Sequence, residues 1–174
     1  MALAVPVPYT WSVGDTGNAA ILNAQIRDPA LFFLNPPVAE YVQTSVQALG
    51  NAATTTLTWP TPATDSYSGY SSSTPTRYTP TVAGWYLVSG NIGFANTSVT
   101  GMRMAQVAKN GATAINQQAL AAATTGYNSA IGVLSLVYLN GTGDYIELQA
   151  NQSSGVALNS VVTLTTLTVL FVHA

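Results

Sequence analysis

The chain has 174 residues, of which 48% are hydrophobic and only 6% are charged, and it contains no cysteine. This composition excludes disorder, disulfide bonds and thiolate metal sites, and the four basic residues form no patch that would bind nucleic acid. No apolar run approaches the roughly 20 residues that span a bilayer, so we expect no membrane partner. Because a surface with so few charges has little defence against association, we expect copies of the chain, or a partner, to cover much of it.

Residues 1–37 differ in pattern from the rest of the chain and are predicted to form an arm followed by a docking helix. Pro6 and Pro8 favour an extended arm, since proline fixes φ and lacks a backbone donor. The segment carries no basic residue before its first turn, so it does not predict a signal peptide. Residues 14–18, rich in glycine and short polar side chains, predict that turn.

A helix is predicted over residues 19–27, with Leu22 and Ile26 four apart on one face. Asp28 is expected to cap a second helical segment, in which Pro29 takes the first position. Residues 35–37 end this segment. An apolar cluster that needs a docking surface lies just before that end, and it consists of Leu31, Phe32, Phe33 and Leu34.

From residue 38 onward, short runs of Thr, Val, Leu and aromatic residues separated by Gly, Asn and Pro predict β-strands. The predicted strands are residues 42–48, 54–59, 84–95, 101–109, 113–121, 129–139, 144–150 and 161–172. Asn110-Gly111 is a strong signal for a hairpin turn, and residues 61–77 are predicted to form a low-complexity surface loop. Strands at this spacing predict an all-β sandwich or jelly roll, with residues 38–174 as the head.

Three of the predicted strands are apolar on both faces. In residues 129–139, Ile131 and Val133 lie on one face, and Leu134 and Leu136 lie on the other. A sandwich has one core, so such a strand needs a second burial partner, and the economical one is another copy of the same sheet. Scattered exposed side chains on a monomer are the alternative. Which face meets the copy is left open, and the predicted contact set is Trp85, Leu87, Leu134, Leu136, Tyr138, Leu167, Val169 and Phe171.

Four motifs follow one another in the head: Gly84-Trp85-Tyr86-Leu87-Val88, Lys109-Asn110-Gly111, Gly132-Val133-Leu134-Ser135-Leu136 and Gly143-Asp144-Tyr145-Ile146-Glu147-Leu148-Gln149. Their order resembles the globular heads of complement and tumour-necrosis-factor type. The resemblance covers about residues 40–174 and implies a ten-stranded jelly roll that assembles as a tight homotrimer. The chain departs from that pattern in its last strand, where Leu167-Thr168-Val169-Leu170-Phe171 replaces the usual aromatic-Ser-Gly, and in an extra Asn-Gly-Thr before Gly143.

The leader contains Trp11-Ser12-Val13-Gly14-Asp15, Ile21-Leu22-Asn23, Ile26-Arg27-Asp28-Pro29 and Phe33-Leu34-Asn35-Pro36-Pro37. These motifs resemble the leader of small virion proteins in tailed phages of actinobacteria, where it precedes a complement-type head. The resemblance implies a structural protein of the virion, namely a trimeric capsid decoration or head-fibre protein attached to the major capsid protein or another virion protein. The residues predicted to dock on the particle are Trp11, Leu22, Ile26, Leu31, Phe32, Phe33 and Leu34.

The alternative is a minor tail or receptor-binding protein with the same fold, and the sequence does not separate the two. In that case the loops would bind a host-surface glycan or receptor. Tyr67 and Tyr70, in the serine-rich loop, are the expected exposed contacts, because tyrosine beside Ser and Gly is adaptable contact chemistry. A plain solvated loop is the competing interpretation.

No set of residues in the sequence predicts catalysis. Asp15-Thr16-Gly17 matches the aspartic-protease triplet, but that chemistry needs two such loops, and a single copy before a helix indicates a turn and a helix cap. His173 has no signal for a paired nucleophile. Asp144 and Glu147, three apart on a strand, are expected on opposite faces and do not share a metal ion. We therefore expect no enzyme activity, no cofactor and no metal.

Overall fold

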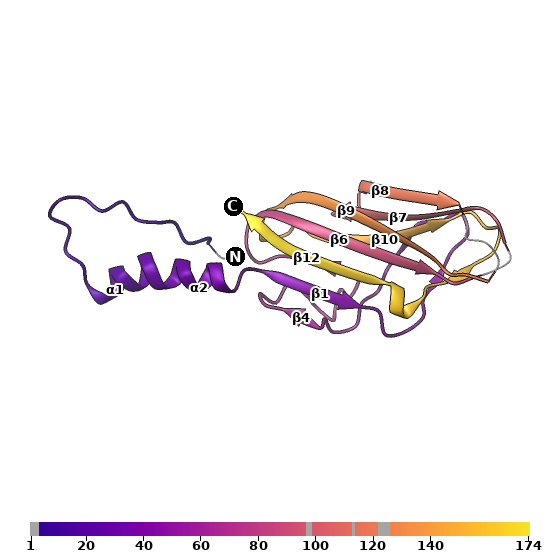
Figure 1. Cartoon of the computed structure of the whole chain (residues 1–174), viewed down its shortest axis with the longest axis horizontal. Helices are drawn as coiled ribbons and strands as arrows, with labels where there is room; N and C mark the ends of the chain where they lie inside the picture. Colours follow the sequence, from indigo (N-terminus) through magenta and orange to yellow (C-terminus); the bar gives the residue numbers. More distant parts are fainter. Residues whose placement is uncertain (1–3, 97–98, 113, 122–125) are drawn as a thin grey trace.

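The computed structural model describes residues 4–96, 99–112, 114–121 and 126–174. It is elongated, with a β-sandwich head and a leader that projects from one end of the head along the long axis (Figure 1). The leader helix leads directly into the first strand, and the N-terminal arm doubles back beside the helix. The junction is tied to the last strand, because the backbone N–H of Phe171 donates to the carbonyl of Pro37 at 2.9 Å.

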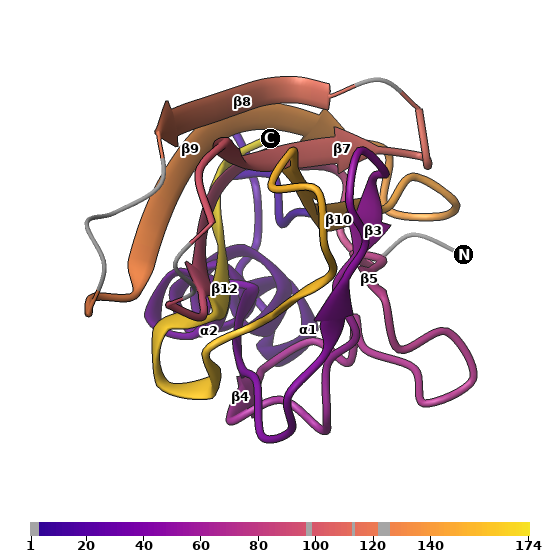
Figure 2. The ribbon, with the colours of Figure 1, turned by 90° about the vertical axis from the view of Figure 1, so that its right-hand side faces the viewer.

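The head consists of two main antiparallel sheets. The first has the order β4 (Thr64–Asp65), β1 (Val38–Val42), β12 (Thr166–His173), β6 (Gly84–Phe94) and β9 (Ser129–Leu139). The second has the order β3 (Thr55–Thr56), β10 (Ile146–Gln152), β7 (Met102–Lys109) and β8 (Ala114–Ala121), and β5 (Arg77–Tyr78) also pairs with β10. A small third pair joins β2 (Ala48–Leu49) to β11 (Leu158–Asn159). Seen along the strands, the two sheets come together at β8 and β9, which lie side by side (Figure 2).

Several predicted strands are confirmed, and others are displaced. The strand over 129–139 is confirmed with both of its ends, and β6 and β7 agree with their predictions to within one residue. The predicted strand 42–48 is wrong: β1 starts directly after Pro37 and ends at Val42. The start of the last predicted strand is also wrong, because Val162–Leu164 forms a 3-10 turn before β12 begins.

The core lies between the two main sheets, and alternate residues of each strand point into it. On β6 these are Tyr86, Val88, Ile92 and Phe94, all fully buried. Gly90 belongs to the same inward series, and a Cβ there would lie 2.4 Å from Cδ1 of Leu148 on β10. The two sheets therefore approach each other closely at this glycine, which no side chain could replace without displacing the core.

The leader helix runs through α1 (Ala19–Leu22), a π-helical turn (Asn23–Arg27) and α2 (Asp28–Leu34) without a break. Asn18 caps its start, with Oδ1 accepting from the backbone N–H of Ile21 at 3.0 Å. The prediction that Asp28 caps a second helix is wrong, because Asp28 lies inside the continuous helix and donates its N–H to the carbonyl of Asn23. In a regular α-helix the ring of Pro29 would clash with the carbonyl of Gln25, four residues earlier. The π-helical turn lies at this position.

The motif segments that follow β7 and β9 meet at one end of the head. Asn110 and Gly111 have positive φ values of 56° and 67°, as the predicted hairpin turn requires. Asn110 Nδ2 donates to Asp144 Oδ1 at 2.8 Å, and Lys109 Nζ forms an ion pair with Asp144 Oδ2 at 2.8 Å. Burial alone would raise the pKa of Asp144, but the hydrogen bonds from Asn110, Lys109 and Asn140 lower it below its usual value. Asp144 therefore joins two loops as a carboxylate.

Candidate interaction surfaces

The outer face of the first sheet, which we call the sheet face, carries rows of side chains from neighbouring strands. Because the strands pair in register, Trp85 lies opposite Tyr138 and Leu87 lies opposite Leu136. Leu170 of β12 continues the second row, since it lies opposite Leu87 on the other side. Side chains that face solvent on adjacent strands form one continuous apolar surface.

Large apolar side chains of the sheet face are exposed on the single chain. Leu134 and Leu136 are each 55% exposed, Tyr138 is 44% exposed and Leu170 is 40% exposed. Among the described residues of this face, the acidic and basic side chains are Glu40 on β1 and His173 on β12, which stacks on Trp85. A contiguous exposed apolar surface of this kind is typical of a protein–protein contact.

The prediction of the contact set is wrong for the residues of the last strand. Leu167 and Val169 are fully buried in the sandwich core, so they cannot meet another copy. Phe171 is half-buried, with its ring against those of Tyr86 and Phe32 at centroid distances of 5.4 and 5.3 Å. The outward residues of this strand are Leu170 and Val172, which the prediction omitted.

The other predicted contact residues have side chains on the sheet face. They are Trp85, Leu87, Leu134, Leu136 and Tyr138. The sequence pattern could not separate the two parities of the last strand, because apolar residues occupy both. The register between β12 and β6 decides the question, because it aligns Leu170 with Leu87 and so determines which side chains share a face.

The sheet face changes in character along the strands. The rows with Trp85 and Leu87 are bulky, whereas the row with Asn91, Gly132 and Thr166 is small and polar. Where the side chains become small, a groove of about 480 Å³ opens between the face and β8, and it is lined by Ser89, Asn116, Gln118, Gly132, Val133 and Leu134. A partner surface would therefore approach more closely at this end than at the bulky end.

The free edge of β9 borders the sheet face and is covered by side chains of the second sheet. Asn116 Nδ2 on β8 donates to the carbonyl oxygen of Leu134. Lys109 Nζ at the end of β7 donates to the carbonyl oxygen of Tyr138 at 2.8 Å. Two backbone acceptors of this edge strand are therefore already bonded within the chain.

The leader bears the second candidate surface. Leu22, Ile26 and Phe33 lie along one side of its helix and are 44%, 59% and 84% exposed; we call these three residues the leader stripe. Leu31, Leu34 and Trp11, which were also predicted to dock, are exposed as well.

Phe32 is the exception among the predicted docking residues. It is half-buried, and its ring contacts Phe171 and Tyr67 of the head at centroid distances of 5.3 and 6.0 Å. Phe32 therefore joins the leader to its own head, and the prediction that it docks on a partner is wrong.

The tyrosines of the serine-rich loop are half-buried, so the prediction that they are exposed is wrong. Tyr67 packs against Phe32 as described above. Tyr70 lies against the core, where its hydroxyl donates to the carbonyl of Trp59 at 3.3 Å and its ring is 5.9 Å from that of Tyr41. Burial also raises the pKa of Tyr41 well above its usual range, so its hydroxyl stays protonated in the core.

The remaining candidate groups form no reactive arrangement in the described part of the chain. Asp15 stabilises a turn, with its carboxylate accepting from Tyr9 Oη at 3.0 Å and from the backbone N–H of Ser12 at 2.6 Å. Among the described residues there is no group of three or more His, Asp or Glu side chains that could hold a metal ion. Nor does any helix in the described ranges have the length and apolarity to cross a membrane.

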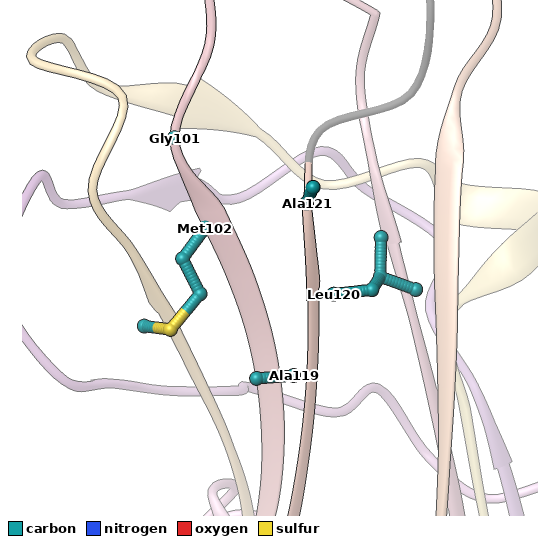
Figure 3. A pocket seen from close by; sticks show the side chains of 5 residues that line it. All are labelled: Gly101, Met102, Ala119, Leu120 and Ala121. Carbon is teal, nitrogen blue, oxygen red and sulfur yellow. The ribbon is translucent and has the colours of Figure 1, made fainter.

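A hollow of about 450 Å³ lies beside the edge strand β8, and its lining contains no titratable side chain (Figure 3). The residues that line it are Gly101, Met102, Ala119, Leu120 and Ala121. A catalytic or ligand site normally combines apolar walls with a few convergent polar groups. These side chains instead extend the exposed apolar surface around β8.

No family model matches the sequence, and no curated protein matches it. Solved structures do match the fold. The structure of Eiger TNF from S. frugiperda aligns with a TM-score of 0.52 and 13% identity over 78% of this chain and 92% of that one. The crystal structure of murine APRIL aligns with a TM-score of 0.53 and 14% identity over 78% of this chain and 98% of that one. The head therefore has the TNF-like jelly-roll fold, and the predicted fold class is confirmed.

Proposed function

We propose that this chain is a non-enzymatic structural protein whose heads associate as a homotrimer and whose leader attaches the trimer to a bacteriophage particle. In this proposal it is a capsid decoration or head-fibre protein located on the virion. The observation that carries the proposal is the sheet face, which exposes leucine and aromatic side chains with hardly any charge. Full burial of such a side chain contributes about 1.5–3 kcal/mol, and roughly half of that is left to gain where about half of the side chain is still exposed.

Three-fold symmetry places a physical requirement on the contact. In a cyclic trimer, each copy must offer two different patches that fit each other, since an interface of one patch with itself gives a two-fold dimer. The sheet face supplies one patch. The flank of β8 supplies a suitable second one, because Ile115 and Leu120 are exposed there, 42% and 40%, next to β9. The TNF-like fold supports the same arrangement as an analogy at the level of the fold.

The leader supports the attachment half of the proposal. It projects from one end of the head, its stripe is exposed, and Phe32 packs on Phe171 of the head. Its motifs, such as Trp11-Ser12-Val13-Gly14-Asp15, resemble phage virion leaders. The partner would be the major capsid protein or another virion protein.

A minor tail or receptor-binding role with the same trimer is the second candidate. The half-burial of Tyr67 and Tyr70 removes the contacts that favoured it, so the decoration role is preferred. The two roles differ in where the trimer sits on the particle. Electron microscopy of particles labelled with an antibody against the head distinguishes them.

The test of the whole proposal uses two measurements. Light scattering of the purified chain should give a mass about three times the 18.0 kDa of one chain. Full-length protein should then co-sediment with phage particles that lack it, whereas a variant without residues 1–34 should remain a trimer in the supernatant. A monomer at micromolar concentration contradicts the assembly, and equal co-sedimentation of the truncated protein contradicts attachment through the leader.

A further inference from the structure

The leader helix has one side that its own chain covers and one side that it leaves open. On the covered side, Ile21, Gln25 and Asp28 are half-buried, as is Phe32. The arm returns to this side, and a hollow of about 480 Å³ between arm, helix and head is lined by Ala4, Pro6, Asp28, Leu31, Phe32, Asn35 and Tyr67. The leader stripe belongs to the open side.

The leader has three charged side chains: Asp15, Arg27 and Asp28. The two on its helix, Arg27 and Asp28, pair with each other. Arg27 Nη2 lies 2.8 Å from Asp28 Oδ1, and the Asp15 carboxylate accepts from Tyr9 and Ser12. The leader helix therefore offers a partner no unpaired charge to recognise, because the Asp15 carboxylate lies outside it in the turn before Asn18. A partner surface with a strong charge would have to give up water without any compensating ion pair.

The helix is already formed before any partner binds. An isolated helix of this length is marginal in water, but the Asn18 cap and the packing of Phe32 on Phe171 hold this one in place. From Ala19 to Leu34 it extends about 24 Å at 1.5 Å per residue. A preformed helix binds without the entropic penalty of ordering a flexible segment.

We propose, building on the attachment role above, that the leader stripe docks as a preformed helix into an uncharged apolar groove of the particle protein. Leu22, Ile26 and Phe33 are the anchors, in the manner of a helix laid in a groove. Attachment is therefore independent of ionic strength. The heads hold three leaders together in the trimer, and the leader stripe supplies the affinity for the particle.

The experiment uses full-length protein and phage particles that lack it, separated by sedimentation. The wild type is compared with Phe33→Ser and Leu22→Ser, and Asn23→Ser serves as the control, since Asn23 is exposed on the same helix outside the stripe. Circular dichroism and light scattering establish that each variant keeps its fold and its mass. Each stripe variant should bind about 10-fold to 100-fold more weakly, as expected for losing one buried apolar side chain, whereas Asn23→Ser binds as the wild type.

The salt series is the second arm. Between roughly 0.1 M and 1 M salt the screening length falls from about 10 Å to about 3 Å, yet the bound fraction should stay the same. Binding that weakens steeply with salt overturns the proposal, as does unchanged binding of both stripe variants. A stripe variant that lowers the mass of the oligomer assigns the stripe to a second copy and also overturns it. If the wild type itself fails to bind, the proposed attachment to particles falls together with this inference.

Discussion

Val169 and Leu170 are neighbours in β12, yet one is sealed inside the sandwich and the other faces out. Val169 pairs with Val88 and is fully buried, whereas Leu170 pairs with Leu87 on the sheet face and is 40% exposed. Val169 therefore contributes to the folding of the protomer, whereas Leu170 is available for association between copies. The same substitution at each position should give two different failures.

Val169→Asp should destabilise the fold itself, because an unpaired charge in the core removes about 3–5 kcal/mol or more from a free energy of unfolding that is commonly 5–15 kcal/mol. Leu170→Asp should leave a folded protomer that no longer associates. Far-ultraviolet circular dichroism reports the first effect and light scattering reports the second. Identical behaviour of the two variants would contradict the assignment of faces.

Leu136→Asp should dissociate the oligomer while the protomer keeps its β spectrum. In a trimer the substitution places three charges in an apolar contact, which should weaken association by roughly 100-fold or more. Ser72→Asp is the matched control, since it adds the same charge to an exposed loop. Sedimentation over a range of protein concentrations measures both. A Leu136→Asp variant that sediments like the wild type would remove the sheet face from the contact.

Two glycines test the packing of the protomer. A Cβ at Gly93 would lie 2.6 Å from Cβ of Leu164 and 2.8 Å from Cβ of Val161, whereas at Gly132 the nearest atom is 3.8 Å away. Gly93→Ala should therefore lower the free energy of unfolding by about 1–3 kcal/mol. Gly132→Ala should not destabilise the protomer. Urea unfolding of both variants at one protein concentration makes the comparison, and equal midpoints would contradict it.

Asp144→Asn should weaken the joint between the two loops. The carboxylate accepts charge-assisted hydrogen bonds, so its loss should lower the free energy of unfolding by about 1–3 kcal/mol at neutral pH. The pKa of Asp144 is lower in the folded chain than the usual unfolded value of about 3.9. Its contribution is therefore complete above that value and is lost as the pH falls through the folded pKa.

The difference in stability between wild type and Asp144→Asn should accordingly be constant from about pH 7 to pH 5 and shrink below about pH 4. Urea unfolding at each pH gives this difference directly. A gap that persists unchanged at low pH would mean that shape at this position matters and charge does not.

The sequence was sufficient for the strands whose pattern is strong. Residues 129–139 carry apolar side chains on both faces in one unbroken run, and β9 has those bounds. Its start and end needed no tertiary information, because Asn140 and Gly141 follow immediately as a turn signal. The first strand was misplaced because it begins directly after Pro37, four residues past the end of the helix at Leu34, and Glu40 interrupts its apolar pattern.

The candidate surfaces were only partly predictable, since a side chain's face depends on its partner strand. Leu167 and Leu170 are chemically the same and lie on opposite faces of the strand, and the register with β6 decides which of the two points into the core. Phe32 and Phe33 are likewise identical in type, and the helix turns one toward Phe171 and the other to solvent. Local pattern identifies an apolar cluster, but the fold decides which of its members is left for a partner.

The hydrogen bonds from Asn116 and Lys109 to carbonyl groups on the edge of β9 affect how copies of this chain can assemble. A strand edge with free carbonyl groups is a template on which further chains can add without limit, and charge repulsion is the usual protection. This chain has four basic and six acidic residues, so it has little repulsion to rely on. With the carbonyls of Leu134 and Tyr138 already occupied, a further strand would have to displace two side-chain hydrogen bonds to add at β9. This favours contact between copies through side-chain surfaces, where a rotation between neighbours can close on itself and fix their number.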